Sequence, residues 1–292
     1  MHSYLRAIGF EELQTEQKLK EILSDVFHEY DERTVTREGK NRAFVEYTKE
    51  FGKNMGIKMC GMMDTEGFHQ EYYFPYFRGK NISSREDLIV EKHAARESFA
   101  GVCEDMRMGV SIIFYVQNAA KYKKETILNH LLSDKISTSF SGLSLQGKIL
   151  LPVAKNEAYM EGGVEAANRR SKMIAAARQG DAEAIESLTL EDIDTYSMIN
   201  RRILKEDLFT IIDTLFMPYG MECDHYQVIG NIKGVEKTVN SYTKEKIYQM
   251  TLECNDMDLD VCINAKDLLG DPEVGRRFKG VIWLQGNINF PD

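Results

Sequence analysis

The chain has 292 residues, and 37 Lys and Arg against 46 Asp and Glu give it a formal net charge of −9. Hydrophobic residues make up 43% of the chain and only 5 residues are proline, a balance that excludes disordered, collagen-like and membrane-embedded chains. A chain of this length is expected to form about two domains.

The cysteines and the opening residues predict a cytoplasmic protein. The five cysteines are scattered and form no C-x-x-C, which favours reduced thiols over disulfides or a zinc site. The opening residues lack a signal-peptide pattern, and no apolar run approaches the roughly 20 residues of a membrane span. We expect no membrane contact, and the acidic balance disfavours broad nucleic-acid binding.

The first half is predicted to be one helix followed mainly by strands. Apolar residues at three- and four-residue spacing predict an amphipathic helix over residues 15–30. Residues 42–77 carry apolar runs between glycine-bearing turns, which predicts hairpins of one antiparallel sheet. Further strands are expected at 87–91, 99–104, 109–117, 137–145 and 148–153, with a helix at 119–132.

The composition changes after residue 153. Alanine-rich residues 164–178, a short segment at 182–188 that Asp181 can cap, and residues 190–204 predict helices. Strands are then expected at 209–216, 226–239, 247–253, 258–263 and 279–290, with a short helix at 265–269. The predicted domains are therefore an N-terminal α+β repeat (1–153), a helical connector (154–207) and a C-terminal β-rich repeat (208–292).

The two halves resemble each other. Four short matches occur in the same order: Pro75-Tyr76 with Pro218-Tyr219, Val90-Glu91-Lys92 with Val235-Glu236-Lys237, the segment from Cys103 with that from Cys254, and the segment from Phe140 with that from Phe278. Their shared order predicts an internal duplication. Each copy would be an antiparallel sheet or a small OB-like barrel with helices, so the fold class is α+β. Glycines of the shared F-x-G and L-Q-G motifs are expected where backbones approach closely.

Several polar residues occur in both copies. They are Glu91 and Glu236, Asp105 and Asp256, and Gln146 and Gln285. They either make turn hydrogen bonds and cross-strand ion pairs, or they form a ligand site at the junction of the copies. Both interpretations stay open on the sequence alone.

A basic loop is specific to the second copy. Arg276, Arg277, Phe278 and Lys279 lie between two glycines, where the first copy has uncharged residues around Phe140. Arginine suits phosphate or carboxylate, and an aromatic ring can stack on a base. These residues are candidates for binding an anion, a nucleotide or single-stranded nucleic acid; the alternative is a solvated hairpin. A second basic stretch comprises Asn168, Arg169, Arg170, Lys172 and Arg178.

No familiar catalytic motif is present. G-x-S-x-G, H-E-x-x-H, P-loop and G-x-G-x-x-G patterns do not occur. The consecutive residues Cys223, Asp224 and His225 would alternate between the faces of a strand and chelate a metal poorly. We therefore expect a binding or interaction protein without cofactor or metal, with a protein or a small anionic ligand as partner. The alternative is an enzyme with a carboxylate site between the copies.

Three segments resemble a known family. They are the opening M-H-x-Y-L-R-A-I-G-F, the middle G-D-A-E-A-I-E-S-L-T-L-E-D-I-D and the ending G-R-R-F-K-G-V-I-W-L-Q-G. They resemble a bacterial family catalogued as domain of unknown function 3881, over essentially the full length. The resemblance implies an intracellular protein of anaerobic Gram-positive bacteria, and it brings no catalytic or binding residues with it.

Overall fold

The computed structural model describes residues 2–13, 15–92, 98–127, 136–152, 173, 176, 181–190 and 212–291. Residues 1–151 and 214–292 form one compact unit, and residues 152–213 form a second. In the second unit, residues 182–190 are helical and Asp181 Oδ1 accepts hydrogen bonds from the backbone N–H groups of Glu183 and Ala184, as predicted. The other two helices predicted for the connector, and the basic stretch at 168–178, lie almost entirely outside the described residues.

A small antiparallel sheet contains the first four strands. Its order is β1 (Glu32–Arg37), β2 (Ala43–Gly52), β3 (Met55–Met63) and β4 (Phe68–Phe77). The predicted hairpins over 42–77 are thus confirmed. Strand β1 was not predicted, because its sequence is polar and Thr36 is its one buried residue.

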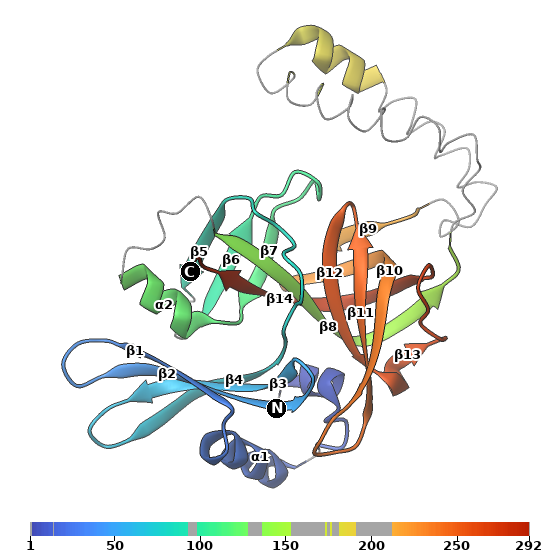
Figure 1. Cartoon of the computed structure of the whole chain (residues 1–292). Helices are drawn as coiled ribbons and strands as arrows, with labels where there is room; N and C mark the ends of the chain where they lie inside the picture. Colours follow the sequence, from blue (N-terminus) through green and yellow to red (C-terminus); the bar gives the residue numbers. More distant parts are fainter. Residues whose placement is uncertain are drawn as a thin grey trace. The chain divides into compact units, whose positions relative to one another are not determined.

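Two helices lie on opposite faces of this sheet (Figure 1). The amphipathic helix α1 (Glu16–His28), capped by the Thr15 side chain, packs Phe27 against Tyr47 of β2 with ring centroids 5.1 Å apart. Helix α2 (Ala119–Ile127) lies over β1 and β2, where Thr36 Oγ1 donates to the Ala120 carbonyl over 2.5 Å. Because strand side chains alternate, the even-numbered residues of β1 and β2 are those on the α2 side. The predicted helices at 15–30 and 119–132 are confirmed for the described residues.

All other strands belong to one large sheet. They are β5 (Leu88–Lys92), β6 (Phe99–Cys103), β7 (Ile112–Val116), β8 (Ser137–Leu150), β9 (Leu215–Pro218), β10 (His225–Val239), β11 (Lys246–Cys254), β12 (Met257–Asn264), β13 (Leu268–Leu269) and β14 (Arg277–Asn289). Two 3-10 helices, η1 (Ser3–Ile8) and η4 (Ala265–Asp267), complete the unit. Two predictions were wrong in detail. The two strands expected within 137–153 are the single strand β8, and the helix expected at 265–269 is one 3-10 turn followed by β13.

Strands from both predicted repeats pair in this sheet. Strand β8 is antiparallel to β14 from Ser137↔Asn289 to Leu150↔Arg277, and it is parallel to β12. Strand β14 is in turn parallel to β7. Read through the β8–β14 pair, the strand order is β5-β6-β7-β14-β8-β12-β11-β10. The β6–β7 hairpin of the first half therefore lies beside β14, the last strand of the second half, and the β11–β12 hairpin lies beside β8, the last strand of the first half. Because β10 also pairs with β14, strands β8, β12, β11, β10 and β14 form a closed cycle of pairings.

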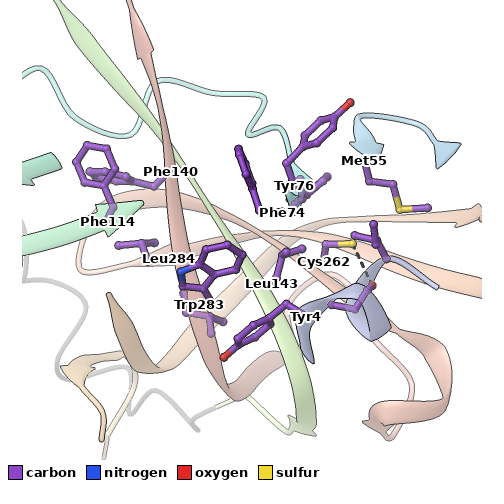
Figure 2. Close-up of a cluster of buried hydrophobic side chains, with 14 of the residues drawn as sticks. Tyr4, Met55, Phe74, Tyr76, Phe114, Phe140, Leu143, Cys262, Trp283 and Leu284 are labelled. Atoms are coloured by element: carbon purple, nitrogen blue, oxygen red, sulfur yellow. Dashed lines mark hydrogen bonds between the residues drawn. The ribbon is translucent and has the colours of Figure 1, made fainter. Parts of the chain in front are cut away.

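The buried core is shared by the two sheets. Figure 2 shows Phe74 and Tyr76 of β4 in one cluster with Leu143 of β8 and Trp283 and Leu284 of β14. All five side chains are buried. The small sheet and the large sheet therefore belong to one hydrophobic core. No helix among the described residues combines the length and apolarity needed to cross a membrane.

Glycines of the shared motifs lie where the chain packs too closely for a Cβ atom, in keeping with the close approach that was predicted. A Cβ atom on Gly147 would lie 2.4 Å from Phe278 Cε2, and one on Gly280 would lie 2.5 Å from Phe278 Cζ. A Cβ atom on Gly286 would lie 2.3 Å from Phe114 Cδ2. These distances are far below a van der Waals contact, so the ring positions require glycine.

Candidate functional site

A polar pocket of about 410 Å³ lies between the α2 side of the small sheet, helix α2 and the end of β14. Charged and amide side chains form nearly all of its wall, which is unusual for a cavity against a hydrophobic core. The lining residues are Glu32, Thr34, Glu46, Lys58, Arg78, Asn118, Lys121, Lys124, Glu125 and Asn287. We call it the Glu46 pocket.

A buried ion pair forms the floor of the Glu46 pocket. Glu46 of β2 pairs in register with Cys60 of β3, so Lys58, two residues earlier, is its diagonal neighbour on the same face. Lys58 Nζ donates to Glu46 Oε1 over 2.5 Å, and Glu46 and Lys58 are only 3% and 5% exposed. The second carboxylate oxygen, Glu46 Oε2, is buried and has no hydrogen-bond partner in the part of the chain that the structure describes.

An aromatic ring covers the ammonium group of this pair. Lys58 Nζ lies 5.6 Å from the centroid of the Tyr76 ring, and the Arg78 guanidinium lies 6.0 Å from the same centroid. Burial raises the pKa of the Tyr76 hydroxyl well above its ordinary value, and that hydroxyl has no hydrogen-bond partner among the described residues. Tyr76 therefore keeps its proton near neutral pH and is a neutral cation–π partner of Lys58.

The rim of the Glu46 pocket is mostly basic. Arg78 is 3.5 Å from Glu32, a weak ion pair between two exposed side chains. Lys121 lies over the ring of Phe290, 5.6 Å from its centroid, and Lys124 is exposed on the next turn of α2. Neither lysine is paired with a carboxylate in the described part of the chain. The pocket thus offers cations at its rim and one carboxylate oxygen at its floor.

A second, larger pocket of about 770 Å³ lies beside α1 and the β10–β11 turn. Its floor is apolar, with Phe10, Leu13 and Ile22 buried. Three of its polar wall residues are already paired, since Lys266 bonds to Glu11 and Asn264 bonds to Glu245. Among the described residues, none that lines this pocket has a buried polar side-chain atom without a hydrogen-bond partner. The pocket therefore gives no such indication of a ligand.

The basic loop is largely engaged with the protein itself. Phe278 is fully buried, and Arg277 is 3% exposed with its Nε donating to the Leu151 carbonyl. Arg276 donates to the Asp271 carbonyl and pairs with Glu273 over 2.9 Å within its own loop. Lys279 is half-buried on β14. Anion binding here stays a prediction, and the ring of Phe278 is not accessible for stacking.

Asp105 and Asp256 are brought together, but by an arginine and not as a carboxylate pair. Arg107 makes a two-pronged bond to the buried Asp105 carboxylate and donates to the backbone carbonyl of Asp256 over 2.7 Å. Burial opposes ionisation of Asp105, but hydrogen bonds from Arg107 and Ser84 outweigh it, so its pKa lies below its ordinary value. A general acid needs the opposite shift, so this geometry favours a structural role.

Gln285 is fully buried where the two sheets meet, whereas Gln146 is exposed. Gln285 Nε2 donates to the Pro75 carbonyl, and Gln285 Oε1 accepts from Gln117 Nε2 over 2.7 Å. Gln117 Nε2 also donates to the Phe77 carbonyl. Gln285 thus joins β14 to β4, and the two shared glutamines have different surroundings.

Glu91 and Glu236 also differ. Glu91 is exposed on β5, whereas Glu236 of β10 forms ion pairs with Lys53 over 2.8 Å and Lys80 over 2.6 Å. Hydrogen bonds from Lys53 and Lys80 lower the pKa of Glu236 to about 2. These contacts lie on the surface and involve neither Asp105 nor Asp256.

We expect Glu236→Gln to lower the free energy of unfolding near neutral pH by less than about 1 kcal/mol, because exposed ion pairs contribute little. The pKa of Glu236 is lower in the folded state than in the unfolded chain. Its contribution to the free energy of unfolding is therefore fully present above the ordinary pKa of a glutamate and is lost as pH falls towards 2. Urea unfolding should therefore show the wild-type advantage shrinking below about pH 4. Glu91→Gln, at the residue aligned with Glu236 in the predicted first repeat, is the control, because Glu91 is exposed and Lys53 and Lys80 bond to Glu236 instead. Equal behaviour of both variants would contradict the role assigned to Glu236.

An aromatic cluster surrounds Asp224. Its carboxylate accepts from Trp283 Nε1 over 2.7 Å and lies 2.9 Å from His225 Nδ1. Tyr4 packs against both rings, with centroids 5.4 Å from Trp283 and 5.6 Å from His225. No group of three or more His, Cys, Asp or Glu side chains in the described ranges could hold a metal ion. The cluster anchors η1 to β14.

Sequence reasoning missed Glu46 and Lys58. The available signal is two opposite charges, each in the middle of an apolar strand of one hairpin. In a strand with one solvated face such positions are ordinarily exposed, so the pattern alone does not mark them.

Comparison with known proteins gives one match. A family model described as a domain of unknown function, with an E. rectale gene description (DUF3881), matches residues 5–286. No curated protein and no solved structure is significantly similar to the chain. Because the match covers nearly the whole chain, the protein belongs to the DUF3881 family, as its opening, middle and closing segments indicated.

Proposed function

We propose that the protein binds a small polar molecule in the Glu46 pocket. The observation that carries this proposal is the buried oxygen Oε2 of Glu46, a residue that lines the pocket: this oxygen has no donor among the described residues, whereas Lys58 bonds to the other oxygen of the same carboxylate. A buried charged group that lacks a partner costs more than an ordinary hydrogen bond gains. A ligand that donates to this oxygen would remove that cost.

The ion pair itself also supports binding over a purely structural role. Buried ion pairs are weak contributors to stability, and apolar residues of similar size are often equal or better replacements. Glu46 and Lys58 lie among Phe44, Cys60 and Phe74, where apolar side chains would pack readily. Charge at this position is better explained by recognition of a charged or polar ligand.

A pair of substitutions on one edge strand tests the proposal. Thr34 lines the Glu46 pocket, and its neighbour Val35 is 41% exposed on the opposite face of β1. Thr34→Tyr should fill the pocket, whereas Val35→Tyr should leave it open, and both keep a residue that favours strands. The melting temperature should be measured with amino acids, organic acids, sugar phosphates and nucleotides at millimolar concentration.

We expect at least one of these classes to raise the melting temperature of wild type and Val35→Tyr, because ligands that bind the folded state stabilise it. Thr34→Tyr should show no rise with the same compound. If no class stabilises the wild type, or if Thr34→Tyr responds as strongly as Val35→Tyr, the Glu46 pocket is not a ligand site.

We also infer that the chain arose by duplication of one β-rich unit. Supporting this, the β6–β7 and β11–β12 hairpins each lie beside the closing strand of the other half, and β8 and β14 pair antiparallel at the centre. An OB-like barrel built from the second copy alone has less support. The closed cycle of paired strands includes β8, which belongs to the first copy. The five free cysteines support a reducing compartment such as the cytoplasm.

A further inference from the structure

The Glu46 pocket has unmet bonding capacity of two kinds at its floor. Lys58 Nζ carries three N–H donors, and the one hydrogen bond seen among the described residues is donated to Glu46 Oε1. Glu46 carries a free acceptor, Oε2. A complementary ligand must therefore present an acceptor and a donor close together, because the ammonium and carboxylate of the pair are themselves only 2.5 Å apart.

The charges of the residues that line the pocket indicate the charge of the ligand. Four cations, Lys58, Arg78, Lys121 and Lys124, face three carboxylates, those of Glu32, Glu46 and Glu125. Lys121 and Lys124 bring positive charge to the rim without a carboxylate partner among the described residues. A ligand carboxylate therefore finds an attractive field at the rim and free N–H groups at the floor.

We propose that the ligand is a small organic acid with a hydroxyl or amino group on the carbon next to its carboxylate. Its carboxylate binds Lys58 and the basic rim, and its O–H or N–H donates to Glu46 Oε2. An α-hydroxy or α-amino acid has this spacing of acceptor and donor. The volume of about 410 Å³ is at the small end for ligand sites, which suits an acid of a few carbon atoms. This inference rests on the proposed function of the pocket.

Three four-carbon acids test the ligand class by calorimetric titration of the full chain. Malate and succinate have the same carboxylates, and malate adds the hydroxyl; aspartate carries an amino group instead. We expect malate or aspartate to bind at least about tenfold more tightly than succinate, because a site built to accept a donor rejects a ligand that lacks it. Glu46→Gln should reduce that ratio towards one, and Val35→Tyr should leave it unchanged.

Each result decides a different question. Equal binding of malate and succinate, or a ratio that Glu46→Gln leaves intact, overturns the ligand class while the pocket survives as a site. If none of the three acids binds, but a compound of another class stabilises the wild type and not Thr34→Tyr, the proposed ligand class is wrong while the pocket remains a ligand site. If no compound of any class binds, the proposed function fails. The wild-type ratio needs no variant, so it decides the matter even if Glu46→Gln does not fold.

Discussion

Lys58→Met should destabilise the protein by about 3–5 kcal/mol, the usual cost of removing one partner from a buried ion pair. Methionine fills a volume close to that of the lysine stem, so the loss comes from the charge left on Glu46 and not from a cavity. Glu46 is 3% exposed and would keep no cation in hydrogen-bond reach at the pocket floor. Equilibrium urea unfolding near neutral pH measures the effect.

The pH dependence of Lys58→Met identifies the cause. Without its cation, the buried Glu46 carboxylate costs more free energy in the folded state than the neutral, protonated carboxyl group does. Proton binding therefore favours the folded variant, so its stability falls as pH rises and recovers as pH falls. The loss of stability should be smaller near pH 5 than near neutral pH.

A double variant serves as the control for Lys58→Met. Glu46→Leu with Lys58→Met removes both charges, and we expect it to be at least as stable as the wild type. If the double variant is as unstable as the single one, the pair is required for packing, and its burial no longer indicates a ligand.

Local elements were predictable because their signals are local. The apolar spacing of Leu19, Ile22, Leu23 and Val26, with Thr15 as the cap, identifies α1 within a residue or two of its ends. Strand β1 was not predicted because a polar edge strand lacks the alternation of apolar residues by which strands are recognised. The two strands expected within 137–153 are one strand because Gly147 continues the pairing with β14, where it lies beneath the ring of Phe278.

Partner choice between distant strands was not predictable. The internal similarity indicates two equivalent sets of strands, but it does not say that β14 lies beside β7 or that β8 lies beside β12. Either arrangement buries the same alternating residues, so one sequence pattern is compatible with separate or interleaved sheets. For the same reason the charges of Glu46 and Lys58 could not be recognised as buried: α2, which covers them, comes from a segment some 60 residues further along the chain.

Phe278→Ala should cost about 3–5 kcal/mol, as expected for truncating a fully buried aromatic side chain. Its ring occupies the space left by Gly147 and Gly280, and neither glycine has a side chain that could move into the cavity. The loss should therefore lie in the upper part of that range. Urea unfolding followed by the fluorescence of Trp283, on the same strand, is a suitable measurement.

Arg276→Ala is the matched control from the same basic loop. Its ion pair with Glu273 lies within the exposed loop, so its loss should cost less than about 1 kcal/mol. A cost for Phe278→Ala as small as that of Arg276→Ala would mean that the ring is accessible, and the basic loop would regain a stacking residue. A large difference would limit any anion contact in this loop to Arg276 and Lys279, because Arg277 is buried against the Leu151 carbonyl.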